Sequence, residues 1–253
     1  MIIHYTEPYF LNPAHKITVN LVGLGGTGSH MLSSLVRLHK TLQALGHPGL
    51  HVRGWDPDIV SEANIGRQLF ADSEIGQQKA IALISRANRH SGLDWEAHPH
   101  IYEDQKGANI LITCIDTAAG RIKIGSCLKP RKTGEITTKP FYWLDMGNLQ
   151  KTGQVVLGTI GAIAQPKTEN TTQGILPDVI RKFPQLKKIK EKDQGPSCSL
   201  AEAIGKQDLF INSTLAQFGA GLIWKLFREG MIQHHGCFVN LDSFQVTPMR
   251  IGV

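Results

Sequence analysis

The chain has 253 residues, of which 41% are hydrophobic and 19% charged, and its net charge is +6. This length suits one large α/β domain or two small ones, and the apolar fraction excludes wholesale disorder. No stretch is apolar enough to span a membrane, and the N-terminus lacks a secretory pattern, so we expect a cytoplasmic protein without membrane contact. The basic residues are mostly dispersed, which argues against a nucleic-acid partner. Their tightest cluster, the basic loop Lys187–Lys192, is interspersed with acidic residues and is expected to be a solvated surface.

Four cysteines, at positions 114, 127, 198 and 237, lie far apart and form no C-x-x-C pair. This spacing argues against a disulfide framework and against a structural zinc ribbon. A reducing compartment and a chain without zinc are therefore expected.

Short apolar runs alternate with helical periodicity in the first half of the chain. Residues 1–16 hold two prolines and show no period, so we expect an irregular arm there. The elements predicted after it, in chain order, are a strand at Ile17–Val22, a helix at Met31–Leu45, a strand at Leu50–Trp55, a helix at Glu74–Asn88 and a strand at Asn109–Ile115. This alternation predicts a Rossmann-like α/β fold, with a largely parallel sheet covered by helices on both faces.

The second half is less regular. It is predicted to contain strands at Phe141–Asp145, Gln154–Ile160, Cys237–Leu241 and Val246–Ile251, a short helical piece near Val179–Leu186, and one or two helices between Ser199 and Glu229. We expect one domain over residues 1–253. Within it, residues 17–120 form a nucleotide-binding half, 161–197 a long crossover excursion, and 198–253 the C-terminal helices and strands.

A glycine-rich loop, G-L-G-G-T-G, joins the first strand to the first helix. Gly23, Gly25, Gly26 and Gly28 remove Cβ atoms where backbone N–H groups and a helix N-terminus could receive a phosphate. Asp56 ends the next strand, 33 positions after Gly23, where a carboxylate can accept hydrogen bonds from ribose hydroxyls. Nicotinamide, flavin and ATP sites share these features, and a structural turn could account for each of them alone.

Two cations just beyond the loop favour ATP among these nucleotides. Arg67 and Lys79 could stabilise the negative charge that builds on the α-phosphate and pyrophosphate when ATP is cleaved between its α- and β-phosphates. Asp116 follows the buried strand at 109–115, where a doubly wound sheet presents ligand-binding side chains, and a carboxylate there could hold Mg²⁺.

Together these residues form the pattern D-P-D-x-V-x-x-x-N-x-x-R-Q, preceded by G-x-G-G-x-G and followed by I-G-x-x-K-A. This pattern resembles the ThiF/MoeB/ubiquitin-activating enzyme family, strongly over residues 17–120. The stretches Pro196–Ala203 and Asn212–Phe218 also resemble, more narrowly, the ThiF-family members of the plasmid-associated PRTRC system.

The resemblance implies a ThiF/MoeB-type adenylation fold and an adenylyltransferase that uses ATP and Mg²⁺. Its substrate would be the C-terminal carboxylate on the exposed tail of a ubiquitin-like or carrier protein, and the enzyme would be a homodimer. It implies that Asp56 binds the ribose, that Asp116 binds the metal, and that the phosphates are held by the loop glycines together with Asn64, Arg67, Gln68 and Lys79.

Many members of the family then capture the acyl group on a cysteine. Cys198 is the candidate here because it precedes a predicted helix, whose dipole would favour a thiolate. The alternative is a structural residue, with Ser197 or Ser199 capping that helix. Cys114 lies in an apolar strand and is expected to be a core residue. The family's N-terminal arginine has no counterpart before Arg37.

Two other functions fit part of the pattern. A nicotinamide oxidoreductase would account for the glycine loop and Asp56, but it leaves both cations unexplained. A non-catalytic protein that binds a nucleotide as a scaffold or switch would account for the loop, the acid and the cations without turnover.

Overall fold

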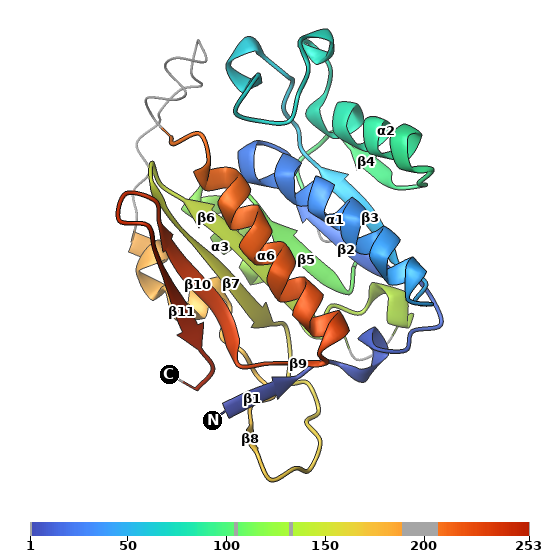
Figure 1. Cartoon of the computed structure of the whole chain (residues 1–253), viewed down its shortest axis with the longest axis vertical. Helices are drawn as coiled ribbons and strands as arrows, with labels where there is room; N and C mark the ends of the chain where they lie inside the picture. Colours follow the sequence, from blue (N-terminus) through green and yellow to red (C-terminus); the bar gives the residue numbers. More distant parts are fainter. Residues whose placement is uncertain (1, 104–105, 132–133, 189–206, 253) are drawn as a thin grey trace.

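The computed structural model describes residues 2–103, 106–131, 134–188 and 207–252. Its main feature is an eight-stranded sheet (Figure 1). The strands of this sheet are β2 (Ile17–Val22), β3 (Leu50–Trp55), β4 (Glu96–His98), β5 (Ile110–Thr113), β6 (Tyr142–Asn148), β7 (Thr152–Thr159), β10 (His234–Asn240) and β11 (Gln245–Arg250). Their order is β11-β10-β7-β6-β5-β2-β3-β4. The five strands from β6 to β4 pair in parallel, whereas β7, β10 and β11 are antiparallel.

Helices cover both faces of this sheet, which confirms the predicted fold class. Helices α1 (Gly26–Ala44), α2 (Lys79–Ser91) and α6 (Ile211–Arg228) pack on one face, and α3 (Ala118–Cys127) and α4 (Val179–Lys182) on the other. None of the described helices is both long and apolar enough to cross a membrane.

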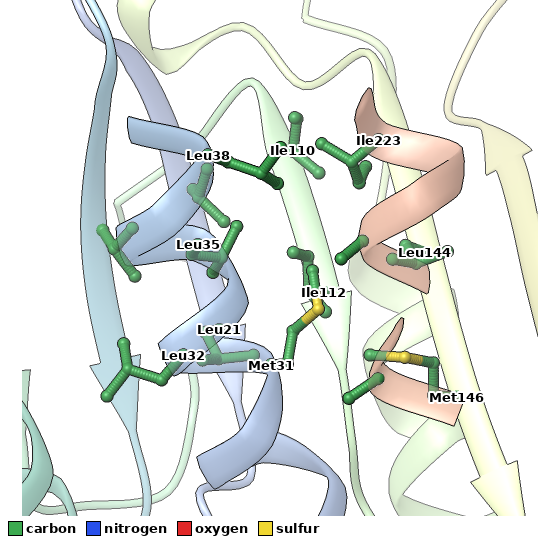
Figure 2. Packing of buried hydrophobic residues seen from close by; sticks show 14 of the residues in the cluster. Leu21, Met31, Leu32, Leu35, Leu38, Ile110, Ile112, Leu144, Met146 and Ile223 are labelled. Atoms are coloured by element: carbon green, nitrogen blue, oxygen red, sulfur yellow. The ribbon is translucent and has the colours of Figure 1, made fainter. Parts of the chain in front are cut away.

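The core therefore has two layers, one on each side of the sheet. In β5, Ile110 and Ile112 face α1 and α6, whereas Leu111 between them packs in the second layer. Figure 2 shows the first layer, in which Met31 of α1 and Ile223 of α6 lie over the same strands. Alternation of side chains along each strand produces this division, and it fixes the register of the sheet against both helical layers.

The prediction of an irregular N-terminal arm was wrong at its start. Residues Ile2–Tyr5 form β1, which pairs in parallel with β8 (Thr171–Thr172) and antiparallel with β9 (Met231–Ile232) (Figure 1). This strand is short, and its partners are more than 160 residues away in sequence, so no local period reveals it.

Two helices also differ from the prediction. The helix α2 begins at Lys79 rather than Glu74, because Asp72–Glu74 form a 3₁₀ turn and Gly76 has a φ of +86°. The helix α3 was not predicted, and its two internal glycines, Gly120 and Gly125, weaken any helical signal. Residues 199–206 of the predicted C-terminal helices lie outside the described residues.

The docking of β1 predicts that acid destabilises the protein. His4 is fully buried between the Tyr142 hydroxyl, 3.0 Å from Nε2, and the Gln173 carbonyl, 2.7 Å from Nδ1. Burial lowers the pKa of His4 and of His235, so both bind protons less readily when folded. Their contribution to stability is therefore complete above pH ~6.5 and is lost as pH falls below it, by up to about 1.4 kcal/mol per pH unit for each histidine.

Thermal unfolding between pH 7.5 and 5.5 tests this expectation. The unfolding midpoint should fall with pH, and the fall should be smaller in His4→Gln, whose amide can occupy the same hydrogen bonds without titrating. Equal pH dependence in the two proteins would contradict it.

Candidate functional site

The glycine loop lies at the carboxyl edge of the parallel strands, between the end of β2 and the start of α1. Gly23 has a φ of +86°, a conformation that favours glycine. A Cβ on Gly28 would lie 1.7 Å from the Gly23 carbonyl oxygen, so no side chain fits there. The first N–H groups of α1 have no partners within the helix and lie at this edge, which is the geometry predicted for binding a phosphate.

Asp56 ties the end of β3 to this loop. Its carboxylate accepts hydrogen bonds from the backbone N–H of Leu24, at 2.6 Å, and from that of Asp58, at 2.9 Å. Burial raises the pKa of the Asp56 carboxyl, while nearby Lys79 and the two N–H groups oppose the rise. Asp56 thus holds the loop in shape, and its role at a ribose stays a prediction.

Lys79 is placed at the first position of α2, next to the turn that follows Asp56. Its Nζ atom lies 2.9 Å from Asp58 Oδ2, and its backbone N–H donates to the Asp58 carbonyl. The Lys79 side chain is buried, whereas that of Asp58 is exposed. The cation is therefore held near the loop by a carboxylate that solvent can reach.

The segment from Asn64 to Gln68 packs against the glycine loop. The Asn64 amide oxygen accepts from the Ser61 N–H at 2.9 Å, and the Gln68 N–H donates to the Asn64 carbonyl at 3.0 Å. This turn brings the buried Gln68 amide to Gly25, where a Cβ would lie 3.8 Å from both its nitrogen and its oxygen.

Two buried polar atoms in this segment lack hydrogen-bond partners. They are Gln68 Oε1 and Arg67 Nε. Buried polar groups are nearly always satisfied in native proteins, and leaving one unpaired costs ~1–3 kcal/mol. An unpaired donor and an unpaired acceptor beside a glycine loop therefore point to a ligand with polar atoms of both kinds.

Asp116 is exposed on the loop after β5 and lies close enough to Arg67 to act on it. Burial lowers the pKa of the Arg67 guanidinium, and the negative charge of Asp116 opposes this change. In the part of the chain that the structure describes, no three His, Cys, Asp or Glu side chains are grouped as a metal site. A single carboxylate nevertheless fits Mg²⁺, which is usually held by one or two carboxylates and by substrate phosphates.

A buried ion pair, which the sequence did not reveal, supports the loop that carries Asp116. Arg121 Nε lies 3.0 Å from both oxygens of Asp145, and Asp145 Oδ1 accepts from the Thr113 hydroxyl at 2.6 Å. The Arg121 guanidinium also donates to the Ile115 carbonyl, immediately before Asp116. Helix α3 and strand β6 thereby fix the position of this loop.

Of the four cysteines, the structure describes Cys114, Cys127 and Cys237, and these three form no disulfide. Cys198, the predicted nucleophile, lies outside the described residues. Burial raises the pKa of the Cys114 thiol, and it raises that of Cys237 to about 11. Both remain protonated thiols near neutral pH, and Cys114 packs against the core, as expected for a residue without a catalytic part.

The ThiF family model matches residues 10–249, and the chain therefore belongs to the ThiF family. No curated protein matches the sequence.

Several solved structures share the fold. PaaA is 13% identical, with 93% of this chain and 64% of PaaA covered at a TM-score of 0.59. E. coli MccB with ATP is 14% identical, with 96% and 65% covered at a TM-score of 0.56. E. coli MccB with MccA is 15% identical, with the same coverage and a TM-score of 0.57. This chain thus spans slightly less than two thirds of the length of these proteins.

Proposed function

We propose that this protein uses ATP to adenylate a carboxylate at the C-terminus of a carrier protein or peptide. The observation that carries the proposal is the pair of unsatisfied buried atoms, Arg67 Nε and Gln68 Oε1, beside the glycine loop. The Arg67 Nε–H group can donate to a phosphate oxygen, and Gln68 Oε1 can accept a hydrogen bond from a hydroxyl group of the same nucleotide. Membership of the ThiF family, and the fold shared with MccB, whose structure with ATP is known, give further support.

The reaction requires alignment and charge more than covalent machinery. A carboxylate oxygen attacks the α-phosphorus, a new oxygen–phosphorus bond forms, and the bond to the bridging oxygen breaks to release pyrophosphate. No general base is required, because the carboxylate is ionised at neutral pH. In this proposal Arg67 and Lys79 stabilise the charge that develops on the phosphates. Asp116 would hold a Mg²⁺ ion, which would supply further positive charge there.

The remaining residues of the site bind the nucleotide. We assign Asn64 and Gln68 to the phosphates with the loop glycines, where the amide nitrogen of Gln68 can donate. We assign Asp56 to the ribose, which it can bind with the acceptor capacity that its two backbone hydrogen bonds leave. Each carboxylate oxygen can accept more than one hydrogen bond, so the contacts of Asp56 with Leu24 and Asp58 do not prevent this role.

Exposed apolar side chains at the same edge suggest a macromolecular substrate. The β6–β7 turn, the residues just before α6 and the β10–β11 turn expose Leu149 (75%), Phe210 (65%) and Phe244 (92%). The ion pair between Lys151 and Asp242, at 2.6 Å, joins the two strand turns. We propose that this surface binds a ubiquitin-like protein whose C-terminal tail enters the site. The resemblance to ThiF-family enzymes, including those of the PRTRC system, implies such a substrate.

Two further features belong to this proposal. The enzyme acts as a homodimer. The Cys198 thiolate attacks the acyl carbon of the adenylate, so that a thioester forms and AMP leaves. Both rest on the family resemblance, and the thioester would form only after the adenylation step.

A synthetic peptide that ends in Gly-Gly tests the adenylation step. Pyrophosphate release from Mg-ATP should require the free C-terminal acid and should be absent with the C-terminal amide of the same peptide, because only the acid supplies the attacking oxygen. Equal release with acid and amide would contradict carboxylate activation.

A nucleotide-binding scaffold without turnover is the second candidate. The pairing of Lys79 with Asp58 favours it, since a neutralised cation stabilises developing charge less well. Tight binding of Mg-ATP without pyrophosphate release, even with the free-acid peptide or a purified ubiquitin-like protein, would favour this function over adenylation.

A further inference from the structure

The first turn of α6 meets the first turn of α1 at the glycine loop, and a buried asparagine joins them. Asn212 is 2% exposed, and its Oδ1 atom accepts a hydrogen bond from the Thr27 hydroxyl at 2.9 Å. A Cβ on Gly26 would lie 2.6 Å from the Asn212 amide, so this glycine leaves the space that the asparagine fills. The two helices pack along each other from this point (Figure 1).

The Asn212 amide also holds the side chain of Gln207, which precedes the helix. Asn212 Nδ2 donates to Gln207 Oε1 at 2.9 Å. The same oxygen accepts a hydrogen bond from Arg67 Nη1. A chain of hydrogen bonds therefore runs from Thr27 in α1 through Asn212 and Gln207 to the guanidinium of Arg67.

The partner that Arg67 has in this arrangement is a neutral oxygen. Charge-assisted hydrogen bonds are roughly twice as strong as neutral ones, and a guanidinium binds phosphate oxygens especially well. A phosphate that reaches this position can therefore displace the Gln207 oxygen, whereas a carboxylate there would retain the cation. The unpaired Arg67 Nε and Gln68 Oε1 atoms beside it indicate that the site is satisfied only when a ligand is bound.

We propose that Gln207 is the resting partner of Arg67, holding the guanidinium in position until a nucleotide phosphate replaces the Gln207 oxygen, and that Asn212 fixes Gln207 for this role. The inference rests on the proposed function and deepens it by adding two positioning residues. Gln207 lies just before α6 and Asn212 lies in its first turn, so the helix that packs on α1 also positions the cation of the phosphate site.

Calorimetric titration of Gln207→Glu with Mg-ATP and with adenosine tests the inference. The carboxylate should retain Arg67 and repel the phosphates, so Mg-ATP affinity should fall about tenfold or more. Adenosine has no phosphate, and its affinity should stay within about twofold of wild type. The matched control is Gln245→Glu, the same charge change on the exposed strand β11, which should alter neither affinity.

Asn212→Ala provides a second variant. It removes the hydrogen bond from Asn212 to Gln207 without adding charge, so Gln207 holds the Arg67 guanidinium in position less firmly. We expect Mg-ATP affinity to fall about threefold and adenosine affinity to stay unchanged. Thermal unfolding without nucleotide confirms that each variant is folded before its titration is interpreted.

The outcomes separate this inference from the proposed function. Mg-ATP binding that depends on Arg67 but is equal in Gln207→Glu and Gln245→Glu overturns the inference alone. Parallel losses of Mg-ATP and adenosine affinity in Gln207→Glu also overturn it, because a structural defect would affect both ligands. Mg-ATP binding that Arg67→Ala leaves unchanged, or no binding by the wild-type protein, overturns the inference and the proposed function together.

Discussion

Replacing Arg67 by alanine is expected to lower the rate of pyrophosphate release with the free-acid peptide by about 100- to 1000-fold. Loss of one preorganised donor to developing transition-state charge has an effect of this size in other enzymes. Arg67 is half-buried beside the glycine loop, where burial strengthens its interaction with a phosphate, and no second arginine from the described residues shares its contact with Gln207.

The matched control for this variant is Arg228→Ala. Arg228 is exposed in the last turn of α6, at the opposite end of the helix from the site, and its loss should leave the rate unchanged. Asp116→Ala should reproduce the defect of Arg67→Ala, with a weaker dependence on Mg²⁺ concentration. Wild-type rates in both site variants would show that the chemistry lies elsewhere.

The second large effect is expected from Arg121→Met. This change leaves the buried Asp145 carboxylate with the Thr113 hydroxyl but without its cation, and breaking a buried ion pair in this way typically costs ~3–5 kcal/mol. In urea unfolding, the free energy of unfolding of Arg121→Met should be lower than that of wild type by this amount. Burial raises the pKa of the Asp145 carboxyl, and Arg121 opposes this rise. In Arg121→Met the pKa of Asp145 should therefore rise further, which favours its protonated form.

Removing both charges provides the control for that variant. The double variant Arg121→Met/Asp145→Leu contains no unpaired charge, and it should recover part of the lost stability. It should not restore the position of the loop before Asp116, since the hydrogen bond from Arg121 to the Ile115 carbonyl is absent in both. A loss below about 1 kcal/mol in Arg121→Met would contradict this assignment.

The elements that surround the glycine loop could be predicted from local sequence. The strand at Ile17–Val22 matches β2 in full, and Leu50–Trp55 matches β3, because each is a short apolar run bounded by turn residues. Arg67 and Gln68 were predicted from a linear motif. The structure brings the Gln68 side chain to Gly25 of the glycine loop, because residues 64–68 form a compact turn.

The parts that were missed depend on contacts between distant segments. Strand β1 exists because residues 171–172 and 231–232 pair with it, and Arg121 is understood only through Asp145 on another strand. Asn212 contributed only to the family resemblance, because its contacts with Thr27 and Gln207 appear when α6 packs on α1. The spacing of residues in the sequence does not predict contacts between segments so far apart.

A comparison of three nucleotides tests whether the site at the glycine loop binds ATP through its phosphates. Purified wild-type protein and Arg67→Ala would each be titrated with Mg-ATP, AMP and NAD⁺. We expect the wild-type protein to prefer Mg-ATP over NAD⁺, and we expect Arg67→Ala to weaken Mg-ATP binding much more than AMP binding. A preference for NAD⁺, with Mg-ATP affinity unchanged in Arg67→Ala, would contradict this expectation.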